Sequence, residues 1–73
     1  MPALLDCYRC PACDQFHDFF DEDNYAFLAE MTYSFTCPVT GEESMLRGVT
    51  SRSNPVSERP AEAVVVRTVA RPG

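Results

Sequence analysis

The spacing of four cysteines constrains this chain more than any other feature of its sequence. Three of them, Cys7, Cys10 and Cys13, fall within seven residues, and the fourth is Cys37. Neighbouring thiolates at this spacing are easily arranged around one metal ion, whereas separate disulfides between them are awkward. The first residues show no charged-then-apolar leader, so we expect a cytoplasmic location and a metal-bound set of cysteines.

The length of the chain gives a second reason to expect a metal. Its 73 residues suit one small domain, and the strong core formers are four Leu, seven Val and five Phe, with no Ile. Such a core rarely supplies more than about 3–5 kcal/mol, so we expect a bound metal to contribute much of the stability. The chain is short for a catalytic domain and has no apolar run near the ~20 residues of a membrane helix. We therefore expect neither an enzyme nor a membrane protein.

Two tight turns carry cysteines, Cys10-Pro-Ala-Cys13 and Cys37-Pro-Val-Thr-Gly41. Two thiolates separated by two residues in such a turn both reach one tetrahedral ion at about 2.3 Å. Proline fixes φ after the first cysteine, and Gly41 permits a positive φ where the second turn ends. Over about residues 5–49, these CPxC and CPxTG turns resemble the zinc-ribbon, or rubredoxin-like, superfamily.

The resemblance implies a small metal-stabilised β fold, in which zinc-ribbon-like hairpins radiate from Zn²⁺. The superfamily usually has a cysteine where this chain has Thr40, so the fourth ligand must come from elsewhere, and Thr40 is expected to donate a hydrogen bond to the Cys37 sulfur. We predict a four-thiolate metal site made of Cys7, Cys10, Cys13 and Cys37. His17, four residues after Cys13, is the alternative fourth ligand in place of Cys7.

Each candidate for the fourth ligand also has a plainer interpretation. Cys7 could be a small buried residue of a first strand, and His17 could be a histidine at the edge of the core. We favour Cys7 because thiolate is the softer ligand and because its use leaves no stray reactive thiol.

An iron–sulfur cluster is the alternative cofactor. The run C-x2-C-x2-C followed later by C-P resembles the ligand set of single-cluster ferredoxins, which bind [4Fe–4S]. Here the residues between the cysteines, Tyr8-Arg9 and Pro11-Ala12, are bulky or stiff, whereas cluster loops tend to supply small residues. The second turn also favours zinc. We expect Zn²⁺, with an iron–sulfur or single-iron site as the alternative.

Strand signals recur along the chain. The clearest is 31–36, where Met31, Tyr33 and Phe35 alternate with polar residues. Further strands are expected in 1–9, 15–20 and 43–49. Residues 21–24 form a turn or, with Asp23 or Asn24 as a cap, begin one helical turn through Leu28.

The composition divides the chain into three parts. Residues 1–49 are the zinc-ribbon-like domain, and 50–61, rich in serine and proline, read as a linker. Residues 62–73 are a β-strand tail whose valines are adhesive if exposed. This C-terminal extended strand could complete the ribbon's own sheet or add to the edge of a partner's sheet.

Charge argues against nucleic acid as the main partner. The net charge is −5, with nine acids and one base in residues 1–46, and two acids and five arginines in 47–73. Affinity for nucleic acid comes mostly from cations on phosphates. We therefore expect a non-enzymatic structural zinc ribbon that mediates protein–protein contact, as a small subunit of a larger assembly or a homo-oligomer, through residues 62–70. A nucleic-acid-associated ribbon and a small iron electron carrier are the alternatives.

Overall fold

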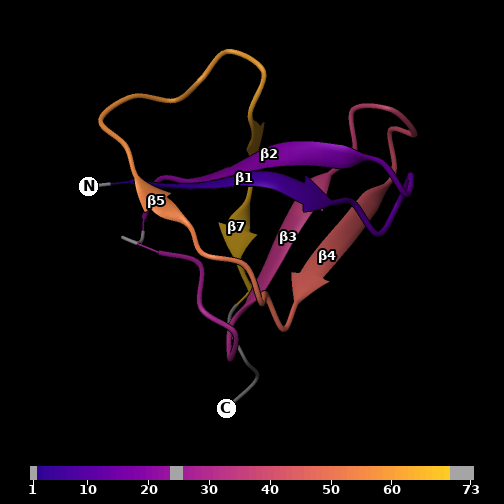
Figure 1. Ribbon diagram of the computed structural model, residues 1–73. Helices are drawn as coiled ribbons and strands as arrows, with labels where there is room; N and C mark the ends of the chain where they lie inside the picture. Colours follow the sequence, from indigo (N-terminus) through magenta and orange to yellow (C-terminus); the bar gives the residue numbers. More distant parts are fainter. Residues whose placement is uncertain (1, 24–25, 70–73) are drawn as a thin grey trace.

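The computed structural model describes residues 2–23 and 26–69, and the strands within them form two small β-sheets (Figure 1). The strands are β1 (Ala3–Arg9), β2 (Phe16–Asp21), β3 (Thr32–Thr36), β4 (Glu43–Arg47), β5 (Asn54–Pro55), β6 (Val64–Val65) and β7 (Arg67–Thr68). The first sheet has the order β5-β1-β2-β6, and the second has the order β4-β3-β7. The described residues contain no helix, so the expected small β fold is confirmed.

The helical turn considered between residues 24 and 28 does not form in the part that is described. Residues 26–30 make bends and turns, and its possible cap Asn24 lies outside the described residues. No helix in residues 2–23 and 26–69 is long and apolar enough to cross a membrane.

Two antiparallel hairpins form the body of the fold. β1 and β2 are joined by residues 10–15, which we call the first cysteine turn, and β3 and β4 by residues 37–42, the second cysteine turn. The alternation that predicts a strand over 31–36 is confirmed, because Tyr33 and Phe35 are buried while Thr32, Ser34 and Thr36 are more exposed. One face of this hairpin is therefore turned to the core.

A β-bulge interrupts β1 before the first cysteine turn. The register shifts between Leu5 and Tyr8, so that Asp6 and Cys7 lie opposite one residue of β2. Regular alternation from the buried Ala3 and Leu5 would turn Cys7 inward as well. The bulge instead leaves both Asp6 and Cys7 exposed, and Cys7 has a left-handed backbone with φ 49°.

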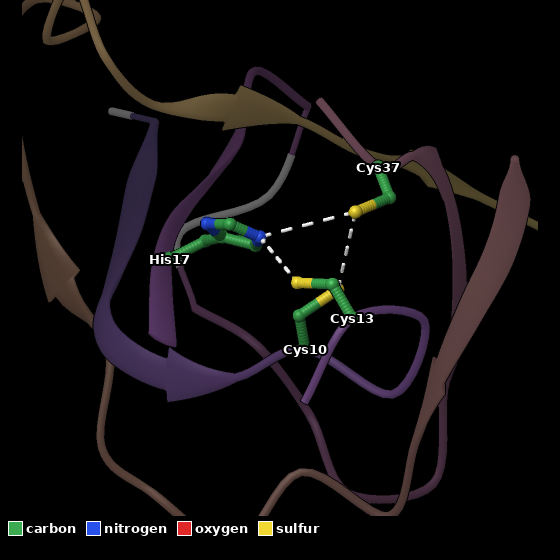
Figure 2. Close-up of side chains that lie close together, drawn as sticks. All are labelled: Cys10, Cys13, His17 and Cys37. Carbon is green, nitrogen blue, oxygen red and sulfur yellow. Dashed lines mark hydrogen bonds between the residues drawn. The ribbon is translucent and has the colours of Figure 1, made fainter. Parts of the chain in front are cut away.

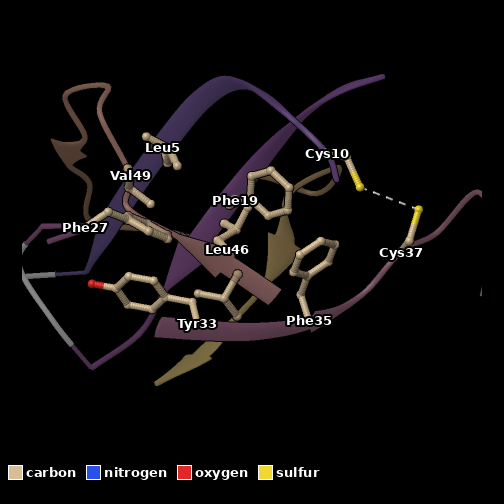
Figure 3. Close-up of a cluster of buried hydrophobic side chains, with 11 residues drawn as sticks. Leu5, Cys10, Phe19, Phe27, Tyr33, Phe35, Cys37, Leu46 and Val49 are labelled. Carbon is tan, nitrogen blue, oxygen red and sulfur yellow. Dashed lines mark hydrogen bonds between the residues drawn. The ribbon is translucent and has the colours of Figure 1, made fainter. Parts of the chain in front are cut away.

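Aromatic side chains form the centre of the core (Figure 3). Phe19 packs edge-on against Phe35 with ring centroids 4.9 Å apart, and Phe27 lies 4.8 Å from Tyr33 by the same measure. Two fully buried cysteines belong to the same cluster, Cys10 and Cys37. The hydrophobic core therefore reaches the place where the two cysteine turns meet.

The C-terminal part of the chain adds strands to both sheets. β5 pairs with β1, β6 runs parallel to β2, and β7 pairs with β3. Val66, between β6 and β7, is buried and donates its N–H to the Phe20 carbonyl at 2.9 Å. Residues 64–68 thus complete the chain's own sheets, which is one of the two uses that the sequence predicts for this strand. Residues 70–73 of the predicted tail lie outside the described residues.

Candidate metal centre

Three cysteines and one histidine converge where the two cysteine turns approach β2 (Figure 2). The Sγ atoms of Cys10 and Cys37 are 3.8 Å apart. His17 Nε2 lies 3.2 Å from Cys13 Sγ and 4.0 Å from Cys37 Sγ. All four ligand atoms lie within 4.8 Å of one another, so a single metal ion could contact all of them.

The two cysteine turns have the same backbone structure. In each, the residue four after the first cysteine donates its N–H to that cysteine's carbonyl, Asp14 to Cys10 at 2.9 Å and Gly41 to Cys37 at 2.8 Å. This residue has a positive φ, 64° for Asp14 and 73° for Gly41. The cysteine N–H groups donate in turn to the carbonyls five residues on, at 2.7 and 2.9 Å. Residues 10–15 and 37–42 are therefore two turns with the same backbone conformation, and each places a cysteine thiol at the site.

Thr40 stands in the second turn where Cys13 stands in the first. Burial raises the pKa of the Cys37 thiol, but hydrogen bonds from the Thr40 N–H and hydroxyl, the Val39 N–H and His17 outweigh burial and lower this pKa to about 6. The Thr40 hydroxyl, for which the sequence predicts a hydrogen bond to the Cys37 sulfur, contributes to the lowering of this pKa, and it accepts a hydrogen bond from the Glu42 N–H at 3.2 Å. Cys37 is held largely as the thiolate near neutral pH, which is the form that binds metal.

His17 lies where it could provide the fourth donor, which the second cysteine turn lacks because it has Thr40 in place of a second cysteine. It lies on the same face of β2 as the buried Phe19, and the two rings meet edge-on with centroids 6.0 Å apart. This half-buried imidazole directs Nε2 towards Cys13 and Cys37. The structure therefore brings together the alternative ligand set, Cys10, Cys13, His17 and Cys37.

Cys7, which the sequence predicts as the fourth ligand, lies apart from these four residues. It is exposed and grouped with Asp6 and Asp18, and its N–H donates to Asp18 Oδ1 at 2.9 Å. The charge of the Asp6 carboxylate raises the pKa of the Cys7 thiol. The physical reason for its position is the bulge in β1, which no feature of the sequence marks. The four-residue spacing from Cys13 to His17 was the signal that pointed to the other donor.

The surroundings of the four residues fit a closed site. Cys10 and Cys37 are fully buried, and Cys13 and His17 are half-buried. Four protein donors complete a tetrahedral set and leave no position for water or substrate, as in structural metal sites. No protein family, curated protein or solved structure matches this chain. The resemblance to zinc ribbons therefore rests on the two cysteine turns and on this cluster.

Proposed function

We propose that this chain is a non-enzymatic structural zinc protein whose metal-supported surface makes a protein–protein contact, as a small subunit of an assembly. The observation that carries the proposal is the convergence of Cys10, Cys13, His17 and Cys37. Two of the donors come from one cysteine turn, one from β2 and one from the other cysteine turn. A single ion at this point would link the two hairpins, and therefore the two sheets.

The distances between the donors suit zinc. With Zn–S bonds of about 2.3 Å and Zn–N bonds of about 2.0 Å, a tetrahedral site separates two sulfurs by about 3.8 Å and a sulfur from a nitrogen by about 3.5 Å. The Cys10–Cys37 sulfur separation is 3.8 Å, and the two distances from His17 Nε2 are 3.2 and 4.0 Å. Three cysteines and one histidine are also a usual donor set for structural zinc.

A multi-iron cluster fits the site less well. Such a cluster must be accommodated between its ligands, and ligand atoms that all lie within 4.8 Å of one another leave room for one ion. The cysteine that would complete an all-thiolate set, Cys7, is exposed in the bulge of β1. A single iron has the same coordination number as zinc, so elemental analysis decides between those two metals.

The donor set supports a structural role over a catalytic one. Three thiolates donate much negative charge, which makes the ion a weak Lewis acid. Catalytic zinc sites instead keep three protein ligands and an open position for water. In the proposed site, His17 would fill the fourth position.

Exposed apolar side chains beside the ligands support the contact role. Phe16, which precedes His17, is 68% exposed, and Val39, within the second cysteine turn, is 56% exposed. Both lie on backbone next to the ligands, which a bound metal would fix in place. Large apolar residues of this kind are a frequent component of protein interfaces.

Metal analysis of the protein purified without added metal tests the proposal. We expect a colourless protein with one zinc per chain. Cys10→Ser should lose the metal, whereas Cys7→Ser, the matched control at an exposed cysteine, should keep it. A brown or red protein that contains iron would replace the proposal with an electron-transfer function.

A further inference from the structure

The edge of the second sheet at β4 is open. In residues 2–23 and 26–69, β4 pairs with β3 on one side and has no strand on the other, and Figure 1 shows it at the margin of its sheet. The other edge strands β5, β6 and β7 have two residues each, whereas β4 has five. A five-residue row of backbone groups without a neighbouring strand is a template for strand addition.

The register shows which backbone groups point to the open side. The Cys37 N–H donates to the Glu42 carbonyl at 2.9 Å, so the even-numbered residues of β4 direct their N–H and C=O groups towards β3. The odd-numbered residues direct theirs to the open side, and these are Glu43, Met45 and Arg47.

The side chains of the same three residues are exposed. Met45 is 39% exposed, with the exposed Glu43 two residues before it and the exposed Arg47 two residues after it. Edge charges of one sign keep strands apart. The edge of β4 instead carries a negative, an apolar and a positive residue at equal spacing. In an antiparallel pair of two such strands, each negative residue lies opposite a positive one, so this pattern attracts a second copy of the same strand.

Space is available beside the strand. A cavity of about 520 Å³ lies between β4 and the first cysteine turn, and its lining includes Met45, Arg47, Tyr8 and Pro11. The other lining residues are Leu46 and the ion pair of Arg9 with Asp14. A strand added to β4 would therefore meet a hollow that offers both apolar and charged side chains.

We infer that β4 pairs antiparallel with β4 of a second copy of this chain, around a twofold axis at Met45. In this register Glu43 lies opposite Arg47 of the partner subunit, and Met45 lies opposite the partner's Met45. All three pairs are hydrogen-bonded pairs, since the odd-numbered residues carry the outward backbone groups. The inference rests on the proposed role in protein–protein contact, and it identifies a second copy of this chain as the partner in that contact.

Charge exchange at the two ends of β4 tests the pairing in the zinc-loaded full chain. Sedimentation velocity from about 1 μM to 1 mM should show wild type moving from the 8.2 kDa monomer towards twice that mass. Glu43→Arg and Arg47→Glu each place like charges opposite one another twice, so each should raise the dimer dissociation constant about tenfold or more.

Mixing the two variants gives the sharper result. In a heterodimer of Glu43→Arg with Arg47→Glu, both charged pairs are again of opposite sign, so the 1:1 mixture should dimerise more tightly than either variant does alone. The double variant E43R/R47E should also dimerise. The matched controls Glu58→Arg and Arg52→Glu change the same charges at exposed positions outside β4 and should behave as wild type.

Two outcomes would overturn the inference. One is a wild-type protein that stays monomeric at the highest concentration, which would leave the β4 edge to a different protein. The other is a dimer that both single variants form as well as wild type does. Zinc content and circular dichroism measured on the same samples show whether each variant is folded. A folded, zinc-loaded monomer would therefore refute the pairing alone and leave the zinc site intact.

Discussion

At the scale of the residue, the main feature of the site is that its fourth possible ligand is His17 rather than a second cysteine of the second turn. Thr40 stands in the second cysteine turn where the first has Cys13, its hydroxyl helps to lower the pKa of the Cys37 thiol, and His17 of β2 is the fourth possible metal ligand of the cluster. Three thiolates and one neutral imidazole carry one negative charge less than four thiolates would. Less repulsion between the donors must therefore be overcome before metal binds.

The four cysteines should differ sharply in their effect on metal binding. Cys7→Ser should leave one zinc per chain and an unchanged affinity, because this side chain is exposed in the bulge and outside the cluster. Cys37→Ser should abolish stoichiometric binding, because it removes a fully buried donor. Competition with a colorimetric chelator measures both affinities. Equal losses in the two variants would contradict the assignment.

Thr40→Val should weaken zinc binding about tenfold or more while leaving the ligand set unchanged. The reason is that valine keeps the shape of the side chain but removes the hydroxyl that helps to lower the pKa of the Cys37 thiol and that accepts the Glu42 N–H at 3.2 Å. Thr40→Ser keeps a hydroxyl and is the matched control, with an affinity expected close to that of wild type. Zinc competition at constant pH is the measurement, and a Val variant that binds as tightly as the Ser variant would show that the Thr40 hydroxyl is unimportant for zinc affinity.

How far the sequence predicts the site is also decided by single residues. Cys10, Cys13 and Cys37 could be placed together because a tight turn has few conformations and puts both of its ends at one point. Cys7 could not be placed, because one extra residue in β1 reverses the alternation of side chains from Cys7 onward. His17 and Cys7 remained alternatives in the sequence for that reason.

At the scale of the element, the two hairpins can be predicted from the local sequence pattern, whereas the pairing of the C-terminal strands cannot. Residues 31–36 alternate clearly, and β3 forms there with its apolar side chains buried. The segment 64–68 is also rich in valine, but its sequence does not say which edge it joins. It pairs with β2 and then with β3, which are contacts between residues far apart in the chain.

Val66→Ala should lower the free energy of unfolding of the zinc-loaded protein by about 1–3 kcal/mol, since it removes buried methyl groups where the chain passes between the two sheets. Val39→Ala is the matched control, because Val39 is 56% exposed, and a change below about 0.5 kcal/mol is expected. Urea unfolding followed by circular dichroism measures both. Equal effects would mean that Val66 is not packed as described.

At the scale of the whole molecule, the metal and the core are of comparable importance. A chain of 73 residues has a net stability of about 4–11 kcal/mol, whereas structural zinc binding releases about 10–16 kcal/mol at pH 7. Cys10 and Cys37 are both ligands of the proposed site and members of the hydrophobic core. Loss of the ion would leave these thiols packed together without the metal–sulfur bonds that would join the two cysteine turns.

Removal of zinc should therefore unfold most of the molecule. Excess chelator is expected to abolish the dispersion of the amide NMR spectrum, and one equivalent of zinc should restore it. The same treatment of Cys7→Ser should give the same result, which excludes an effect of the exposed thiol. A dispersed spectrum that persists after complete removal of zinc would show that the core suffices alone.

X-ray absorption at the zinc edge tests the central claim most directly, because it counts the atoms bound to the metal. For the zinc-loaded wild-type protein we predict three sulfurs at about 2.3 Å and one nitrogen at about 2.0 Å, with the nitrogen lost in His17→Cys and retained in Cys7→Ser. Four sulfurs in wild type, reduced to three in Cys7→Ser, would contradict the assignment of His17 and return Cys7 to the metal site.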